Sequence, residues 1–118
     1  MTVSDYISGA RQKLADAKAG PRFTDVDIRL SLDEAYRQLK RVRPAAGYVD
    51  GRLIRSASED ISFKDADDAQ TVRDSLDRYA EGIMFFSAAR LLMNDNFDTQ
   101  NLVVADKWIE MAMAIWRS

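Results

Sequence analysis

The chain has 118 residues, of which 47% are hydrophobic and 31% charged, as in an ordinary globular domain and unlike a disordered chain. It contains no cysteine and no histidine, which excludes disulfides, thiolate metal sites, thiol nucleophiles and imidazole bases. Its net charge is −2, but residues 1–58 carry eleven Lys/Arg against seven Asp/Glu, whereas residues 59–118 carry six against twelve. Such opposed patches either attract copies of the chain or form two solvated faces.

Apolar residues at alternating steps of four and three predict a first helix over residues 3–18. The residues that share this face are Val3, Ile7, Ala10, Leu14 and Ala17. Gly20-Pro21 ends the helix, because glycine accepts a left-handed cap and proline cannot continue the hydrogen-bond ladder.

A second helix is predicted over residues 24–43. Thr24 is a good N-cap, Asp25 and Asp27 suit the first turn, and Phe23 is placed to form a hydrophobic staple with Ile28. Pro44 closes the helix after two arginines that suit its C-terminal end. The predicted buried stripe consists of Ile28, Leu32, Ala35, Leu39 and Val42.

Residues 45–66 are predicted to be irregular or to form a β-hairpin. Asp50-Gly51 between β-forming residues is the usual signal of a two-residue hairpin turn. Residues 61–63 are a candidate third short strand. An isolated hairpin is marginal in water, so we expect the helices or a neighbouring subunit to support it.

Two further helices are predicted over residues 67–93 and 98–116, joined by a turn. The core stripe of the third helix consists of Val72, Leu76, Tyr79, Ile83 and Phe86. We therefore expect an all-α fold, with one small four-helix domain over residues 1–118 and the hairpin or irregular insertion between helices 2 and 3.

The last two helices are too apolar for a single buried stripe. Arg90 is the one charged residue between 82 and 93, and twelve of the fifteen residues from 102 to 116 are apolar. Helices that are apolar on several sides are central or contact partners, so we predict an oligomer. Trp108, Met111 and Trp116 are candidate interface residues, with the protein core as the alternative for the two tryptophans.

The sequence contains none of the metal-binding, phosphate-binding or catalytic motifs that we tested. A calcium loop starting at Asp65 would need Gly at its sixth position and Glu at its twelfth, where the chain has Gln70 and Leu76. The five glycines are scattered, so there is no phosphate-binding loop, and no Ser-x-x-Lys motif occurs. We expect no enzyme, no cofactor, no metal site and no membrane segment.

The second helix ends in a basic cluster made of Arg37, Lys40, Arg41 and Arg43. Such a cluster can bind nucleic-acid phosphates, but the acidic pI of about 5.1 and the lack of interleaved aromatic residues favour a solvated helix end. A small helical DNA-binding or regulatory protein-interaction module remains the alternative function.

Residues 7–44 resemble the head-to-tail connector (adaptor) proteins of tailed bacteriophages. In that family a short helix with an Ala-Arg-x-x-Leu-like stretch precedes an aromatic-Thr-Asp helix start and a helix that ends in Arg-Pro. Two later helices, here residues 79–93 and 103–116, also look similar. The residues that match are Ala10, Arg11 and Leu14, then Phe23-Thr24-Asp25, then Ile28, Leu32 to Leu39, and Val42-Arg43-Pro44.

The resemblance implies a structural virion protein that assembles in the host cytoplasm. Copies would form a homo-oligomeric ring, twelve-fold on the portal protein, that extends the DNA channel and offers a docking surface to a tail or stopper protein. DNA would pass without sequence-specific binding. On this interpretation the basic cluster lies at a subunit or portal contact, and the acidic residues Asp65, Asp67 and Asp68 are candidates for the channel lining.

Overall fold

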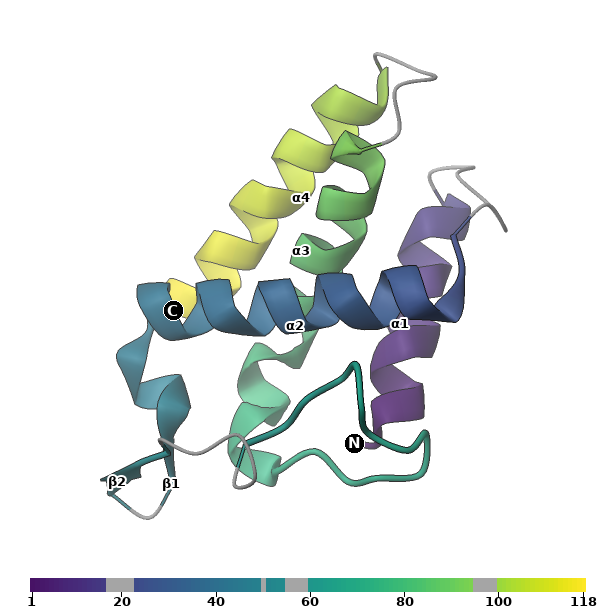
Figure 1. Ribbon diagram of the computed structural model, residues 1–118. Helices are drawn as coiled ribbons and strands as arrows, with labels where there is room; N and C mark the ends of the chain where they lie inside the picture. The colour runs from purple at the N-terminus through teal and green to yellow at the C-terminus, as the bar shows by residue number, and fades with distance from the viewer. Residues whose placement is uncertain (17–22, 50, 55–59, 95–99) are drawn as a thin grey trace.

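Helix α3 (Ala80–Met93) lies in the middle of the computed structural model and packs against the three other helices (Figure 1). The structure describes residues 1–16, 23–49, 51–54, 60–94 and 100–118. The other helices are α1 (Val3–Asp16), α2 (Asp25–Val42) and α4 (Gln100–Arg117), and a two-stranded hairpin of β1 (Tyr48–Val49) and β2 (Arg52–Leu53) lies between α2 and α3. The predicted all-α fold with four helices and a hairpin insertion is confirmed.

The apolar stripes predicted from the sequence form the core. On α1 and α2 the predicted residues that the structure describes are buried, with Val42 partly so, and Ala17 lies outside the described residues. Tyr6 and Tyr36 are also buried beside these stripes. The predicted stripe of the third helix is buried as well, although Val72, Leu76 and Tyr79 precede α3.

Helix α2 begins with a reciprocal capping box. The Thr24 hydroxyl accepts a hydrogen bond from the Asp27 N–H (3.2 Å), and the Asp27 carboxylate accepts one from the Thr24 N–H (3.1 Å). Each bond satisfies a backbone donor that has no partner within the helix. Phe23 and Ile28, the predicted staple, both pack into the hydrophobic core.

The third helix begins later than the sequence predicts, because its first residues serve helix α1. The carbonyls of Asp68 and Gln70 accept the N–H groups of Ser4 and Val3 (both 2.9 Å), and the Val72 N–H donates to the Met1 carbonyl (2.8 Å). These bonds satisfy backbone donors at the start of α1 and so keep residues 67–73 out of a helix. A 3-10 helix over Asp74–Tyr79 then leads into α3.

Residues 61–63 do not form the predicted third strand. The Phe63 N–H donates to the Asp33 carboxylate (2.7 Å) rather than to a strand, and the buried Phe63 ring lies 5.1 Å from the Tyr6 ring centroid. Arg29 donates to the carbonyls of Phe63 (2.8 Å) and Ala66 (2.6 Å). Side chains of α2 therefore fix this loop beneath the helix.

The predicted hairpin is present and has the expected register. Tyr48 pairs with Leu53 and Val49 with Arg52, and Gly51 in the turn has a φ of 75°, a conformation that favours glycine. A 3-10 helix over Pro44–Gly47 connects the end of α2 to β1. The hairpin lies at one corner of the molecule, beyond the end of α2 (Figure 1). Within the described residues, no helix combines the length and hydropathy that a membrane crossing requires.

Candidate functional site

The surplus apolar surface noted in the sequence lies on α4 and not on α3. Helix α3 is buried on most of its circumference because α1, α2 and α4 surround it. On α4, by contrast, Leu102 is 47% exposed, Val103 72% and Met111 38%. Exposed apolar residues on one outer helix are typical of a contact surface, so α4 is the first candidate for binding a partner.

Trp116 is a core residue, which corrects its place among the candidate interface residues. Its side chain is fully buried, its Nε1 donates to the Tyr79 carbonyl (3.3 Å), and its ring lies 5.5 Å from the Phe86 ring centroid. Gly82 leaves room for the indole, since a Cβ there would approach Nε1 within 2.4 Å. The end of α4 is thereby anchored on α3.

Trp108 and Met111 remain candidates on the flank of α4 that faces α1. Trp108 is half-buried, and its ring lies 6.1 Å from that of Phe85 on α3. The ammonium group of Lys13 from α1 lies 4.0 Å from the Phe85 ring centroid and pairs with Glu81. Trp108 is held in place by these contacts while Met111 is exposed beside it.

The basic cluster at the end of α2 is not one patch. Lys40 pairs with Asp60 (3.1 Å) and lies 4.4 Å from the Tyr36 ring, and Arg43 donates to the backbone oxygen of Ser118 (3.2 Å). Arg37 and Arg41 are exposed, and among the described residues neither has a carboxylate within 4.0 Å. Arg41, and Arg37 with only a longer-range attraction to the Asp33 carboxylate, are therefore the members of the cluster most accessible to a partner.

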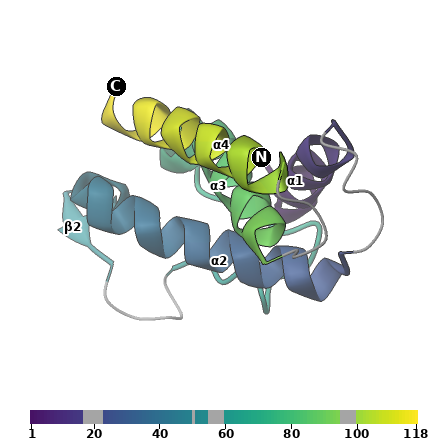
Figure 2. The same ribbon diagram turned by 90° about the horizontal axis from the view of Figure 1, so that it is seen from above.

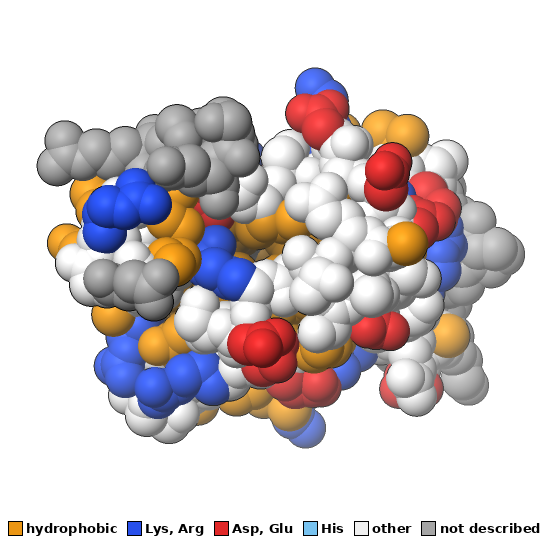
Figure 3. All heavy atoms as spheres, turned by 90° about the horizontal axis from the view of Figure 1, so that it is seen from below, with side chains coloured by type: hydrophobic (Ala, Val, Ile, Leu, Met, Phe, Trp, Pro, Cys, Tyr) orange, Lys and Arg blue, Asp and Glu red, His pale blue; other side chains and the backbone are white. Residues whose placement is uncertain are grey.

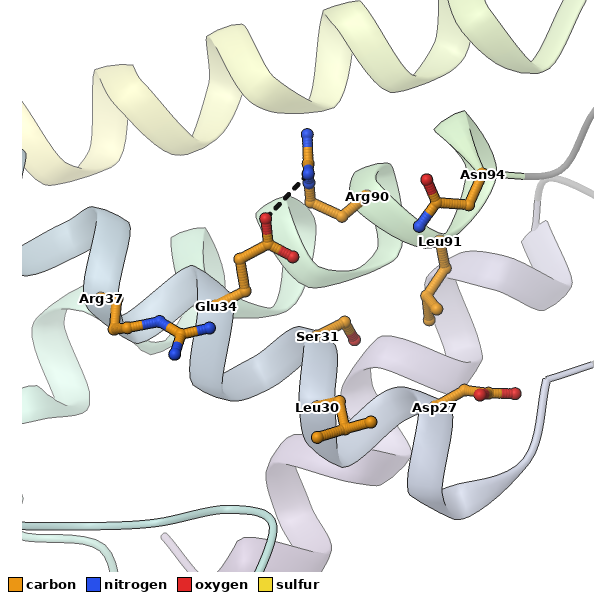
Figure 4. A pocket seen from close by; sticks show the side chains of 8 residues that line it. All are labelled: Asp27, Leu30, Ser31, Glu34, Arg37, Arg90, Leu91 and Asn94. Atoms are coloured by element: carbon orange, nitrogen blue, oxygen red, sulfur yellow. Dashed lines mark ion pairs between the residues drawn. The ribbon is translucent and has the colours of Figure 1, made fainter.

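A shallow hollow of about 300 Å³, lined by both polar and apolar side chains, lies between α2 and α3 (Figure 4). Leu30 and Arg37 line it from α2, and Glu34 reaches across to pair with Arg90 of α3 (2.8 Å). A second hollow of about 320 Å³ adjoins it on α2 and includes Arg41. Exposed apolar and basic side chains thus share the outer face of α2.

A partly buried polar cluster, which the sequence analysis missed, joins the hairpin base to α2. Asp60 accepts hydrogen bonds from the Tyr36 hydroxyl (2.6 Å) and from Arg73 (2.8 Å), and Arg73 also donates to the Ala46 carbonyl (2.5 Å). Burial pushes the Asp60 pKa up, but the bonds from Tyr36, Arg73 and Lys40 outweigh it and hold the pKa below its ordinary value. Burial raises the pKa of Tyr36. These paired groups serve to hold the structure together.

The acidic candidates are all exposed on the loop before the 3-10 helix over Asp74–Tyr79. Asp68 pairs with Arg29, Asp65 accepts a bond from the Ser62 hydroxyl (3.4 Å), and Asp67 is exposed. Figure 3 shows this side of the molecule, where Lys and Arg side chains are densest at the hairpin end and Asp and Glu side chains spread over the rest. The described residues contain no group of three or more Asp, Glu, His or Cys side chains arranged to hold a metal ion.

Comparison of the chain with protein-family models, with curated proteins and with solved structures finds no match. A function therefore has to be inferred from the sequence and from the exposed surfaces of the fold.

Proposed function

We propose that the chain is a non-catalytic structural subunit of a head-to-tail connector, as the resemblance over residues 7–44 implies. The observation that carries this proposal is the outer face of α4, where Val103 is 72% exposed on a helix whose other side is anchored in the core. A subunit of a larger assembly needs such a surface, whereas a monomer gains nothing from it.

In this proposal each copy would contribute to a ring beneath the portal. The apolar residues of α4 would make protein contacts, together with the half-buried Trp108 and the exposed Met111. The exposed acidic loop that contains Asp65, Asp67 and Asp68 would line the channel, because carboxylates repel DNA phosphates and let the duplex slide.

The hairpin supports the same proposal as a candidate docking point. It lies at a corner of the molecule, and its paired residues Tyr48 and Leu53 are 43% and 38% exposed. Two adjacent apolar side chains on a projecting hairpin suit contact with a portal or tail protein better than contact with solvent.

A second candidate function is DNA binding through α2. Arg37 and Arg41 favour it, because they are exposed on one helix face and have no carboxylate within 4.0 Å among the described residues, although Asp33 attracts Arg37 at longer range. This alternative predicts salt-sensitive binding of duplex DNA that Arg37→Glu with Arg41→Glu abolishes.

The test of the connector proposal is binding of the purified chain to rings of the portal protein encoded nearest to its gene. Titration of fluorescent duplex DNA is the companion measurement. A connector adds to the portal and has little affinity for free duplex, whereas a DNA-binding protein gives the opposite pair of results.

A further inference from the structure

Four residues on the exposed side of α2 and four on the exposed side of α4 follow the same spacing along their helices. On α2 these are the exposed Leu30, Arg37 and Arg41 and the partly buried Glu34, and on α4 they are the exposed Val103, Lys107, Glu110 and Ala114. Both sets follow steps of four, three and four residues, so each forms one stripe along its helix. We call these sets the α2 stripe and the α4 stripe.

The two stripes are complementary when they are read in the same direction. Each begins with an exposed apolar residue, Leu30 at 46% and Val103 at 72% exposed. The next two positions are acidic then basic on α2, and basic then acidic on α4. At the last position, Arg41 would meet Ala114, a small residue that leaves space for the guanidinium.

The charges of these stripes are available for a partner. Within the described residues, no ion pair within 4.0 Å involves Arg37, Lys107 or Glu110, although the Asp33 carboxylate attracts Arg37 at longer range. Glu34 pairs with Arg90 (2.8 Å) and is still about two-fifths exposed, so it can accept a second cation.

The two stripes lie on the exposed sides of helices that pack mainly against α3, although α2 and α4 also contact each other and Arg43 bonds to Ser118 at their C-terminal ends. One neighbour of this kind therefore covers one stripe and not both. Gly82 and Phe86 of α3 face Trp116 on α4, while Ser87 and Arg90 face α2. Figure 2 shows α2 and α4 along different sides of the molecule with α3 between them. A contact between an α2 stripe and an α4 stripe is therefore heterologous and leaves a free stripe on each copy.

The directions of the two helices also suit a ring. In both Figure 1 and Figure 2, α2 and α4 run from their N-terminal to their C-terminal ends in the same general direction. A modest rotation from one copy to the next thus places α4 of one parallel to α2 of the other. Repeating such a rotation closes a ring of several copies when no translation along the rotation axis accompanies it, and otherwise gives an open helical filament.

We propose that a second copy of this chain occupies the α2 stripe, with its α4 lying parallel to α2 so that Val103 meets Leu30, Lys107 meets Glu34 and Glu110 meets Arg37. This inference deepens the proposed connector function and rests on it for its biological role. The antiparallel arrangement with the same overlap sets Glu110 against Glu34 and Lys107 against Arg37, and like charges in contact disfavour it.

Cysteine cross-linking tests the pairing and its direction, because the chain has no native cysteine. One pool of chains carries Leu30→Cys and a second pool carries Val103→Cys. We expect the mixed pools to form the 30–103 disulfide under mild oxidation, and a chain with both substitutions to form a ladder of oligomers. The pair Leu30→Cys with Ala114→Cys reports the antiparallel arrangement, and Ser8→Cys on the exposed side of α1 replaces Leu30→Cys as the control.

Charge reversal tests the chemistry of the same contact. Arg37→Glu in the first pool, or Glu110→Arg in the second, should slow 30–103 cross-linking roughly tenfold, and the two changes together should restore it. Lys64→Glu makes the same change of net charge as Arg37→Glu on an exposed residue outside both stripes and should leave the rate unchanged.

A 30–103 yield no higher than that of the Ser8 control would overturn the proposal, as would preferential 30–114 cross-linking or failure of the two reversals to compensate. If the chains cross-link as expected but do not add to portal rings, the contact between copies is supported and the connector role is contradicted. If the chain adds to the portal and neither charge reversal weakens this binding, the connector role is supported and the proposed contact is contradicted.

Discussion

Gly82 lies directly beneath the indole of Trp116, so close that a Cβ on Gly82 would come within 2.4 Å of Nε1. The same indole donates to the carbonyl of Tyr79, one turn earlier along the chain. This contact fixes the C-terminal end of α4 on α3 and thereby decides which face of α4 is left for partners.

Gly82→Ala should lower the free energy of unfolding by about 1–2 kcal/mol, because overpacking outweighs the better helix propensity of alanine. Gly9→Ala is the matched control on α1. Its Cβ would meet the thioether of Met84 at 2.3 Å, but methionine changes rotamer easily, so the loss should be smaller. Urea unfolding of both variants shows which one loses more free energy of unfolding. Equal losses would show that the indole is free to shift.

Two buried tyrosines should respond in opposite ways to replacement by phenylalanine. The Tyr6 hydroxyl is buried and has no hydrogen-bond partner among the described residues, whereas the Tyr36 hydroxyl bonds to Asp60 and Arg73. We expect Tyr6→Phe to raise the free energy of unfolding by about 1 kcal/mol and Tyr36→Phe to lower it by about 1–3 kcal/mol. Denaturant unfolding of the two variants is the measurement, and a loss in Tyr6→Phe would contradict the expectation.

Asp60→Asn should lower the free energy of unfolding by about 3–5 kcal/mol at neutral pH, because it leaves the half-buried guanidinium of Arg73 without its carboxylate. Asp67→Asn, on an exposed residue of the same loop, is the control and should change little. Thermal unfolding followed by circular dichroism compares the two.

Acid should remove the contribution of Asp60. Its folded pKa is depressed below the ordinary 3.8, so this stabilisation is present above pH 3.8 and is lost as the pH falls through the folded pKa. The stability difference between the wild type and Asp60→Asn should therefore shrink below pH 3.8. A difference that stays constant down to acid unfolding would rule out the Asp60 ion pairs as its cause.

Val103→Asp should leave the fold intact and reduce assembly. Val103 is 72% exposed, so the free energy of unfolding should change by no more than about 0.5 kcal/mol. A carboxylate in an apolar contact costs binding energy because it loses its hydration there. Co-sedimentation with portal rings measures the effect, with Ser8→Asp on α1 as the control. Binding equal to that of the wild type would exclude this end of α4 from the contact.

The core of the first two helices could be predicted from sequence because it depends on local periodicity. Tyr6 and Tyr36 lie outside the predicted apolar stripes, yet both are buried. The late start of α3 could not be predicted from the sequence, because it depends on the carbonyls of residues 68 and 70, which accept hydrogen bonds from the first N–H groups of α1. Local spacing carries no information about such long-range bonds.

The candidate site was predicted less well, for the same reason. Lys40 and Arg43 belong to a basic cluster in the sequence, but Asp60 and Ser118 engage them in the folded chain. Trp116 follows the apolar pattern of α4 and is nonetheless core, because Gly82 makes room for it. Val26 and Leu30 went unnoticed, although two apolar residues four apart and off the buried stripe of α2 are a readable signal.

The most direct test of the connector proposal is to mix the purified chain with isolated portal rings and to examine the product by sedimentation and electron microscopy. The proposal predicts a stoichiometric ring of this protein added to one face of the portal, and fewer such rings when Val103→Asp replaces the wild type. A chain that stays a monomer or dimer beside the portal and binds duplex DNA instead would contradict it.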